Sequence, residues 1–431
     1  MNAGKGFINH PANESNWLSW IFLLVNFALT YFIAVEESYN FIFLAGLIVN
    51  IGLLVFFFRR INNLVLNISR ILLGALFIYS GIVKGVDPLG TMFKIEDYFY
   101  AYNTIWAIPF ALILSVILNA AEFTLGALLL LRVNMKWVSI LSLLMMLMFT
   151  LTTLYDALYS PVPDCGCFGD ALVISNWQTF YKNLVINSFL LLVFLRRFDF
   201  KPYKSKIVEY STIVLVIFGF ITFENYNLNN LPIIDFRPWK VGNRLLPENP
   251  KPVKYFLTYK NVQTGEEKEF LSVDLPWQDS IFMADWKWAH SREEDPNITQ
   301  MNVFPMIDAE GNDVSKEIVS DENYTFIFVI YQVDDVDVNL VPMMNEFFVK
   351  ATTAGYNTLI LSSALPEEFY KFQEDNKLVD FPIYNSDDTS LKAAIRSNPG
   401  LIVVKSGVVI AKYHYNNIPD FTIFIKELTL D

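Results

Sequence analysis

Cys165 and Cys167 are the only two cysteines of the chain, and Gly166 alone separates them. A disulfide between such close residues closes a small ring that needs a tight backbone, which glycine permits. Strain in that ring raises the reduction potential, so the bond would oxidise a partner dithiol more readily than a structural disulfide does. The neighbouring Asp164 and Asp170 act in the opposite sense, because negative charge disfavours a reactive thiolate. Two interpretations stay open: a redox-active pair, and a passive disulfide that braces a loop.

Histidines do not complete a metal site around this pair. A structural zinc ion is generally held by four Cys or His ligands. The chain has three histidines, His10, His290 and His414, and all of them lie far from the cysteines in the sequence. We therefore predict no metal ion at the cysteines.

Two further residues could do chemistry because they interrupt apolar segments. Glu122 lies within a long apolar segment, where an ionisable group is costly and is usually functional or paired, and Asn119 precedes it by one helical turn. Glu122 could contact a proton or a quinone headgroup, or it could form a helix–helix hydrogen bond as a protonated carboxyl. Lys84 lies at the end of another apolar segment. We interpret it as an interfacial lysine whose ammonium extends to the lipid headgroups, unless it pairs with Asp87 or Asp164. Lys84 and Asn119 are kept with Glu122 as candidate contacts of a proton or a quinone.

The elements that must position these residues are membrane helices. Hydrophobic residues make up 53 % of the 431-residue chain and charged residues 18 %. Apolar runs of about 18 residues or more are long enough to cross a bilayer. We predict seven such helices, over residues 17–35, 39–58, 64–82, 105–131, 137–156, 177–195 and 207–223. A polar turn over residues 87–90 and a surface-lying amphipathic segment over 91–100, with tyrosines at headgroup level, are expected between the third and fourth helices.

Basic residues predict the orientation of these helices. They gather in alternate connections, namely Arg59, Arg60, Arg132, Lys136, Arg196, Arg197, Lys201, Lys204 and Lys206. The positive-inside rule then places the N-terminus in the cytoplasm, and the cysteines and the C-terminal half outside. The N-terminal segment lacks the pattern of a cleaved signal peptide, so the first helix is expected to stay as an anchor. An outer compartment that favours disulfides suggests a bacterial inner membrane that faces the periplasm.

Charge separates the two halves of the chain. From Glu224 onward, 18 Lys and Arg oppose 32 Asp and Glu, a balance of −14, whereas the whole chain has 32 − 44 = −12. The membrane half is therefore close to neutral and the outer half is acidic. Neither half has the basic face that binding to nucleic acid requires.

Two motifs in the membrane half resemble a known family. The string SGIVKGVDPLG at residues 80–90 looks like the DoxX superfamily, and the string CGCFG at 165–169 looks like its MauE branch, named for methylamine utilisation. The resemblance covers residues 67–195 and implies a core of four helices. It also implies a role in thiol or sulfur redox chemistry, or in the maturation of disulfide-rich partners. Quinone-linked disulfide generators generally use two cysteine pairs, so the single pair of this chain would have to contact its electron donor and acceptor directly or borrow the cysteines of a partner protein.

The C-terminal half has the pattern of a soluble α/β domain. Residues 225–252 indicate a linker, 254–273 a hairpin with Gly265 in its turn, and 274–299 give no clear assignment. Strands and helices then alternate. We predict a strand–turn unit at 304–315, strands at 324–331, 357–363 and 381–384, a hairpin at 398–414, and helices at 339–354, 366–376, within 386–397, and at 420–430.

This order is similar to that of a thioredoxin fold. The string NPGLIVVKSGVV at residues 398–409 resembles the thioredoxin segment in which a cis-proline opens a strand, so Pro399 would be that proline. Residues 332–337 stand where a thioredoxin has its Cys-x-x-Cys, and they contain no cysteine. The domain is therefore expected to dock a partner in a groove beside Pro399 without exchanging disulfides itself. The acidic cluster Asp334, Asp335 and Asp337 is more typical of a solvated turn than of a cation site.

We expect a polytopic helical membrane protein followed by a thioredoxin-like domain. Its regions would be two additional helices at 1–66, the MauE-like core at 67–200, the seventh helix at 201–224, a linker and hairpin at 225–300, and the soluble domain at 301–431. The expected function is thiol–disulfide redox chemistry or partner maturation in the envelope, with Cys165 and Cys167 as the redox pair and quinone as one acceptor. The alternative is a non-enzymatic scaffold in an envelope assembly or secretion complex.

Overall fold

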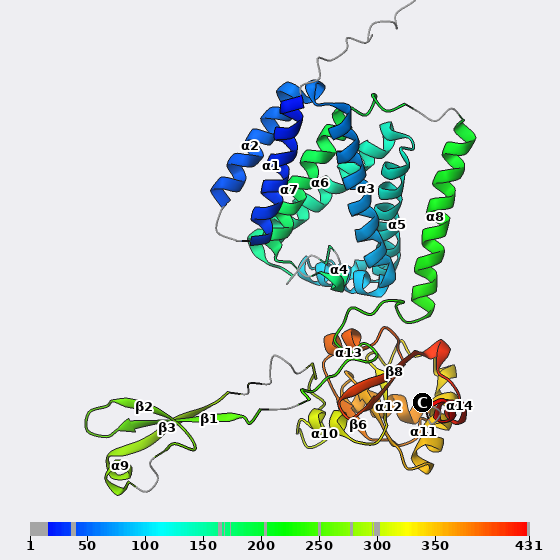
Figure 1. Cartoon of the computed structure of the whole chain (residues 1–431). Coiled ribbons are helices and arrows are strands. Elements are labelled where there is room, and N and C mark those ends of the chain that lie inside the picture. Colours follow the sequence, from blue (N-terminus) through cyan, green and yellow to red (C-terminus); the bar gives the residue numbers. More distant parts are fainter. Residues whose placement is uncertain are drawn as a thin grey trace, which may run out of the picture. The chain divides into compact units, whose positions relative to one another are not determined.

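The computed structural model describes residues 16–35, 40–162, 166–167, 169–172, 174–201, 205–248, 251–275, 279–294, 296 and 302–428. The chain divides into two compact units, Met1–Ile234 and Asp235–Asp431. The first unit is helical and the second is built around β-sheets (Figure 1).

Within its described residues, the helical unit has seven helices that are long and apolar enough to cross a membrane, as predicted. They are α1 (Asn16–Val35), α2 (Asn40–Phe57), α3 (Asn63–Val86), α5 (Ala111–Leu131), α6 (Met135–Tyr159), α7 (Asn176–Leu195) and α8 (Lys206–Asn229). Shorter helices are η1 (Phe58–Arg60), α4 (Pro88–Ala101), η2 (Ile105–Phe110) and η3 (Gly169–Ala171). Three spans end later than expected, because α3 continues to Val86, α6 to Tyr159 and α8 to Asn229.

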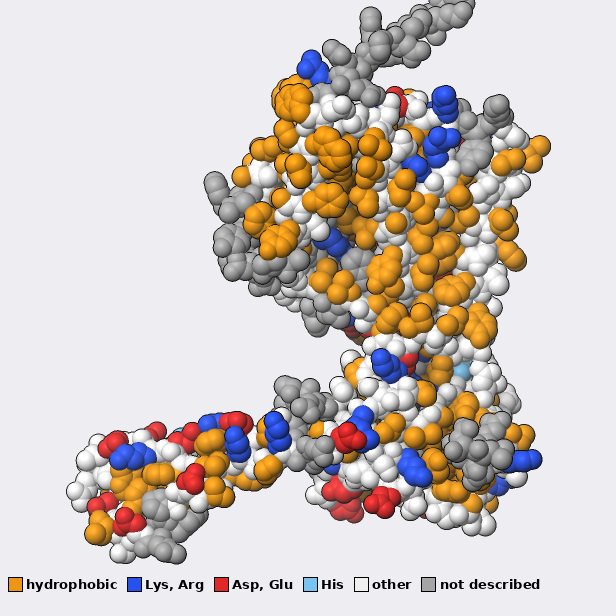
Figure 2. Space-filling model, viewed as in Figure 1, with side chains coloured by type: hydrophobic (Ala, Val, Ile, Leu, Met, Phe, Trp, Pro, Cys, Tyr) orange, Lys and Arg blue, Asp and Glu red, His pale blue; other side chains and the backbone are white. Residues whose placement is uncertain are grey.

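The surface of this unit is apolar where lipid would contact it. Figure 2 shows hydrophobic side chains over most of the visible face, with Lys and Arg gathered near one end. Phe56 and Ile207 are each 77 % exposed, although both are large apolar residues. Extensive apolar exposure of this kind is costly in water and favourable in hydrocarbon. The surface therefore agrees with the membrane assignment.

Glycines let α3 and α5 pack closely. A Cβ placed on Gly74 would lie 2.9 Å from the Gly126 carbonyl oxygen, and one placed on Gly81 would lie 2.9 Å from the Phe123 backbone. Small residues at a helix contact allow the two backbones to approach, a common packing mode in membranes. At the other end of this pair, the Arg70 guanidinium donates a 2.7 Å hydrogen bond to the Leu130 carbonyl. These contacts fix α3 against α5.

The predicted polar turn at 87–90 is instead a junction between two helices. Asp87 ends α3 and caps α4, because its carboxylate accepts a 3.0 Å hydrogen bond from the Gly90 amide. Pro88 is the first residue of α4, a position where its missing N–H costs nothing. Ser115 of α5 donates a 2.7 Å hydrogen bond to the Pro88 carbonyl. The start of α4 is thereby attached to α5.

The second unit contains a five-stranded mixed sheet in the order β6-β5-β4-β7-β8. Its strands are β4 (Thr325–Ile330), β5 (Asn357–Ser362), β6 (Ile383–Asn385), β7 (Gly400–Lys405) and β8 (Val408–His414), with α10 (Ser315–Ser320), α11 (Val341–Thr353), α12 (Pro366–Asn376), α13 (Asp388–Ala394) and α14 (Phe421–Leu428). β4 pairs in parallel with β5 and antiparallel with β7. The peptide bond before Pro399 is cis, as predicted. This topology resembles thioredoxin-like folds.

Both edges of this sheet are covered by segments that were assigned differently from the sequence. At β8, the Gly242 and Leu245 amides donate hydrogen bonds of 2.8 and 2.7 Å to carbonyls of the last hairpin. At β6, Ile307 and Asn385 exchange two backbone hydrogen bonds of 2.8 Å. The expected linker therefore packs on the sheet over 235–248, and the expected strand–turn unit at 304–315 contributes only isolated bridges. We name these two edge-covering segments the edge caps.

A smaller sheet in the order β2-β1-β3 precedes the larger one. It comprises β1 (Lys254–Asn261), β2 (Glu267–Leu271) and β3 (Trp286–Glu294), with the short helix α9 (Ser280–Asp285). The predicted hairpin is confirmed, and Gly265 in its turn has a φ of +74°. The third strand falls in the segment that had no assignment. Its Trp286 packs with Tyr259 and Leu275 in a small core.

Candidate functional site

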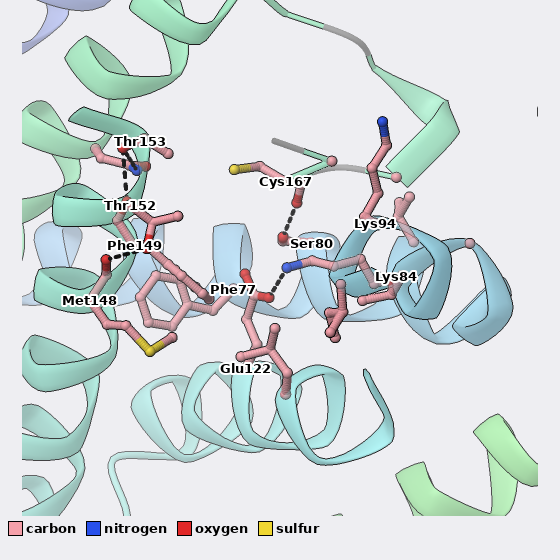
Figure 3. A pocket seen from close by; sticks show the side chains of 18 of the residues that line it. Phe77, Ser80, Lys84, Lys94, Glu122, Met148, Phe149, Thr152, Thr153 and Cys167 are labelled. Carbon is pink, nitrogen blue, oxygen red and sulfur yellow. Dashed lines mark hydrogen bonds and ion pairs between the residues drawn. The ribbon is translucent and has the colours of Figure 1, made fainter. Parts of the chain in front are cut away.

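A pocket of about 210 Å³ lies inside the helical unit, between α3, α4, α5, α6, α7 and the cysteine loop. Figure 3 shows side chains from these elements converging on it. Ser80, Lys84, Glu122 and Cys167 belong to its polar part, and Phe77 and Phe149 belong to its apolar part. The structure therefore brings together three of the residues predicted to carry function, Lys84, Glu122 and Cys167.

Lys84 and Glu122 form a buried ion pair between α3 and α5 (Figure 3). Only 6 % of the Lys84 side chain and 7 % of the Glu122 side chain are exposed. The expectation of a lysine that extends to the lipid headgroups is therefore wrong. Since α3 continues beyond Ile82 to Val86, Lys84 lies within the helix and faces α5. The Lys84 ammonium also lies 5.5 Å from the centre of the Phe149 ring.

Asn119 belongs to the same polar junction but contacts the backbone of α3. Its side chain is fully buried, and its amide nitrogen lies 3.4 Å from the Lys84 carbonyl oxygen and 3.5 Å from the Ser115 hydroxyl. These are long, weak hydrogen bonds. Asn119 therefore links α5 to α3 beside the ion pair.

The cysteine loop is attached to the pocket through Cys167. The Ser80 hydroxyl donates a 2.8 Å hydrogen bond to the Cys167 carbonyl, and the Cys167 side chain is half-buried (Figure 3). Gly166 has a φ of +61°, and a Cβ at this position would lie 3.0 Å from Cγ of Lys94. Asp170 lines the pocket, whereas Cys165 and Asp164 lie outside the described residues. The site predicted at Cys165 and Cys167 is therefore described for Cys167 alone.

Other residues in or beside the pocket were not predicted from the sequence to be site residues. The Tyr98 hydroxyl donates a 2.6 Å hydrogen bond to the buried Asp156 carboxylate, which joins α4 to α6. The Asn183 amide donates to the Thr153 hydroxyl at 3.1 Å, which joins α7 to α6. Asp156 is the last residue of the fifth span predicted from the sequence. An acid at the end of an apolar span was the signal that could have identified it.

The pocket combines a charged end with an apolar body. A cavity of about 150 Å³ is known to accept benzene, so about 210 Å³ is enough for one substituted ring. The hydroxyl and charged groups beside it can form hydrogen bonds with a carbonyl oxygen on such a ring. A small ligand with a polar carbonyl and an apolar ring therefore matches this chemistry.

In the soluble unit, Pro399 is itself buried. The Asn398 side chain donates a 2.6 Å hydrogen bond to the Gln332 carbonyl, so the cis-proline loop contacts the segment that replaces Cys-x-x-Cys. Within that segment, Asp337 accepts a 3.0 Å hydrogen bond from the Asn339 amide and caps the short helix η5 (Val338–Leu340). A groove beside Pro399 would have to be formed by neighbouring side chains, and its docking role stays a prediction.

His414 pairs with Gly400 across the last hairpin, next to Pro399. Only 3 % of its surface is exposed, and its Nδ1 accepts a 3.2 Å hydrogen bond from the Asn416 amide. Burial lowers the pKa of His414 to about 4. The imidazole is therefore neutral near pH 7, and His414 is no proton donor for a docked partner.

Solved structures similar to the soluble unit each cover 30 % of this chain. A putative thioredoxin from Neisseria meningitidis is 18 % identical over 86 % of its own chain, with a TM-score of 0.24. A thiol:disulfide interchange protein from Bacteroides sp. is 17 % identical over 84 % of its chain, with a TM-score of 0.24. StoA from Bacillus subtilis is 21 % identical over 96 % of its chain, with a TM-score of 0.23.

Curated proteins give no match to the chain. The family model for methylamine utilisation protein MauE matches residues 62–197, which include the SGIVKGVDPLG and CGCFG strings. The matched range also contains α3 to α7, and hence every element that lines the pocket. Residues 62–197 therefore form a MauE-type membrane domain, which is followed by a membrane helix and a soluble unit with a thioredoxin-like fold.

Proposed function

We propose that the chain is a membrane component of envelope thiol–disulfide chemistry that oxidises or matures a partner protein. The observation that carries this proposal is the pocket itself. It places the Cys167 peptide, held by Ser80, on the same cavity as the buried Lys84–Glu122 ion pair. A buried charged pair beside a cysteine loop, within a MauE-type domain, favours redox chemistry over simple bracing of the loop.

The proposed reaction has two balanced steps. A partner dithiol first reduces a Cys165–Cys167 disulfide, so that one disulfide forms in the partner as the other opens. The Cys165–Cys167 dithiol then gives two electrons and two protons to a quinone, which becomes a quinol and restores the disulfide. The pocket has the size for one quinone ring, and Lys84 and Glu122 are the groups that would form hydrogen bonds with its oxygens.

The soluble unit is proposed to dock the partner. It has a thioredoxin-like sheet but contains no cysteine, so it contributes surface and not thiol exchange. Under the orientation predicted from the basic loops, the N-terminus lies in the cytoplasm, and the cysteine loop and soluble unit face the periplasm.

The direct test is to trap the exchange intermediate. A thiolate that attacks a disulfide forms a mixed disulfide, which persists when the resolving cysteine is absent. Single Cys165→Ser and Cys167→Ser variants of the full chain should each be examined in cells by non-reducing electrophoresis and mass spectrometry. We expect one of them to accumulate a covalent adduct with an envelope protein, and the double variant to accumulate none.

The double variant also provides the functional control. If neither single variant forms an adduct, and the double variant matures its dependent proteins as well as the unchanged chain, the redox proposal is wrong. The alternative scaffold function then gains support from the cysteine-free soluble unit. Under that alternative, removal of residues 235–431 abolishes function while the double cysteine variant keeps it.

A further inference from the structure

Glu224 is a buried acid that the proposed chemistry does not use. It lies in α8, outside the MauE-type domain, and its side chain is fully buried. Among the described residues, neither of its carboxylate oxygens has a hydrogen-bond partner of ordinary geometry. Much of α8 faces outward, since Leu215 is 72 % and Phe218 is 69 % exposed. A largely lipid-facing helix thus buries this acid against the bundle.

Aromatic stacking places Glu224 at the level of the pocket. The rings of Phe123 in α5 and Phe220 in α8 stack with centroids 4.3 Å apart and an interplanar angle of 13°. Asn119 lies one helical turn before Phe123, and Glu224 lies one turn after Phe220. Because Asn119 and Glu224 are neighbours, α5 and α8 run in opposite directions. Figure 1 shows α8 beside α5.

A contact between α8 and α3 also places Glu224 at the level of the pocket. Asn227, less than one turn beyond Glu224, donates a 3.1 Å hydrogen bond to the Gly85 carbonyl. Gly85 follows Lys84, and a Cβ on Gly85 would lie 2.5 Å from the Phe220 ring. The backbone of α3 at Lys84 therefore meets both Asn119 and α8.

The charges of this junction do not balance without a proton. From α3 and α5, the charged groups at this level are Lys84 and Glu122, which pair with each other, and Asp87 at the end of α3, whose carboxylate caps α4. α4 also packs on α8, and it carries Lys94, Glu96 and Asp97. One ammonium cannot neutralise two carboxylates, and an unpaired carboxylate in a dry interior is strongly disfavoured. The junction becomes neutral when one carboxyl holds a proton.

We propose that Lys84, Glu122 and Glu224 together form a proton-binding site that holds a single exchangeable proton, carried by Glu224. The site is assembled only when α8 packs on the MauE-type domain, because the third group comes from outside that domain. Asn119 separates Glu224 from the backbone of Lys84 and positions it at the junction.

The use of this proton rests on the proposed function. When a partner thiolate attacks the Cys165–Cys167 disulfide, a new sulfur–sulfur bond forms between the partner and one of the two cysteines. The Cys165–Cys167 bond breaks, and the other cysteine leaves as a thiolate. The site gives its proton to that thiolate and becomes negatively charged. It regains a proton from the second partner thiol, whose thiolate then completes the exchange.

Infrared spectroscopy of the full chain in lipid nanodiscs tests the site without any thiol chemistry. A protonated carboxyl has a carbonyl stretch that a carboxylate lacks. Glu224→Gln should remove one such band at pH 7. Lys84→Met should add a second band of similar strength, because the site then has no ammonium and both acids take a proton. Glu224→Asp keeps an acid and should keep a band at a shifted frequency.

Glu209→Gln is the matched control. Glu209 is also a buried acid of α8, but its carboxylate pairs with the Lys206 ammonium at 2.7 Å, so its replacement should leave the protonated-carboxyl band unchanged. The proposal is overturned if Glu224→Gln leaves the protonated-carboxyl bands unchanged, or if Glu209→Gln removes one of them. The Cys165→Ser, Cys167→Ser double variant should keep the band, so failure of the redox function would not remove it.

The rate of partner adduct formation against pH provides the second readout. Glu224→Gln should change the shape of that profile, and Glu209→Gln should not. A Glu224→Gln variant that keeps the original profile shows that the proton is not used in exchange. Absence of adducts at every pH in both single-cysteine variants instead contradicts the proposed function and leaves the proton site standing.

Discussion

Replacing Lys84 by Met should destabilise the helical unit by removing one partner of a buried ion pair. Met has a similar length and no charge, so the change removes the ammonium and leaves the packing of α3 against α5 largely intact. Glu122 is then left without its cation in a site where only 7 % of its side chain is exposed. Removing one partner of such a pair typically costs about 3–5 kcal/mol.

We therefore expect Lys84→Met to lower the free energy of unfolding by about 3–5 kcal/mol at pH 7. Unfolding by SDS in mixed micelles at pH 7, followed by tryptophan fluorescence, measures this difference. The Lys84→Met, Glu122→Gln double variant removes both charges and should lie within about 1 kcal/mol of the unchanged chain. Lys136→Met, at an exposed lysine, should change stability by less than about 0.5 kcal/mol. The reasoning is refuted if Lys84→Met matches that control, or if the double variant is no more stable than the single one.

Two further predictions concern His414 and Gly166. The folded pKa of His414, about 4, lies below the ordinary value of about 6.5, so the unfolded chain binds the proton first. Stability of the soluble unit against urea should therefore fall by about 2 kcal/mol between pH 6.5 and pH 4. His414→Gln should abolish that fall, whereas a change at the exposed His290 should not. Gly166→Ala places a Cβ at a positive φ and against Lys94, which should destabilise this conformation of the loop by about 1 kcal/mol. The loop should then open more readily, so Cys167 in a Cys165→Ser background should be labelled faster by maleimide. Gly242→Ala, with a φ of +82° and open space, should leave the labelling rate unchanged.

Much of the architecture follows from patterns that are local in the sequence. Apolar run length predicted the seven helices, because a bilayer demands that each span be continuous. Alternating buried strands and helices predicted the five-stranded sheet, and the Asn398–Pro399–Gly400 string predicted its cis-proline. The edge caps were missed, since residues 235–248 and Ile307 pair with strands far away in the chain. A composition rich in Asn and Pro indicates a linker, but it does not indicate where that segment packs.

The polar junction was only partly predictable, for a related reason. Lys84 and Glu122 were both identified, but their pairing joins residues 38 positions apart and depends on the close contact of α3 and α5. Lys84 looked interfacial because the expected span ended at Ile82, two residues before Lys84. Glu224 was excluded in the same way, since the last span was expected to end at Phe223. Hydropathy sums end a helix where polar residues begin, although a buried polar residue can belong to its last turns.

The edge caps also bear on how this chain behaves at high density. Proteins confined to a bilayer meet copies of themselves often, and an open strand edge is a template for pairing with a neighbour. Gly242, Leu245 and Ile307 occupy hydrogen-bonding positions at the two edges of the five-stranded sheet. Those positions are closed both to a neighbouring copy and to a client segment arriving as an added strand. Crowded copies are therefore not joined through these edges, and a partner docked as proposed would be recognised through side chains.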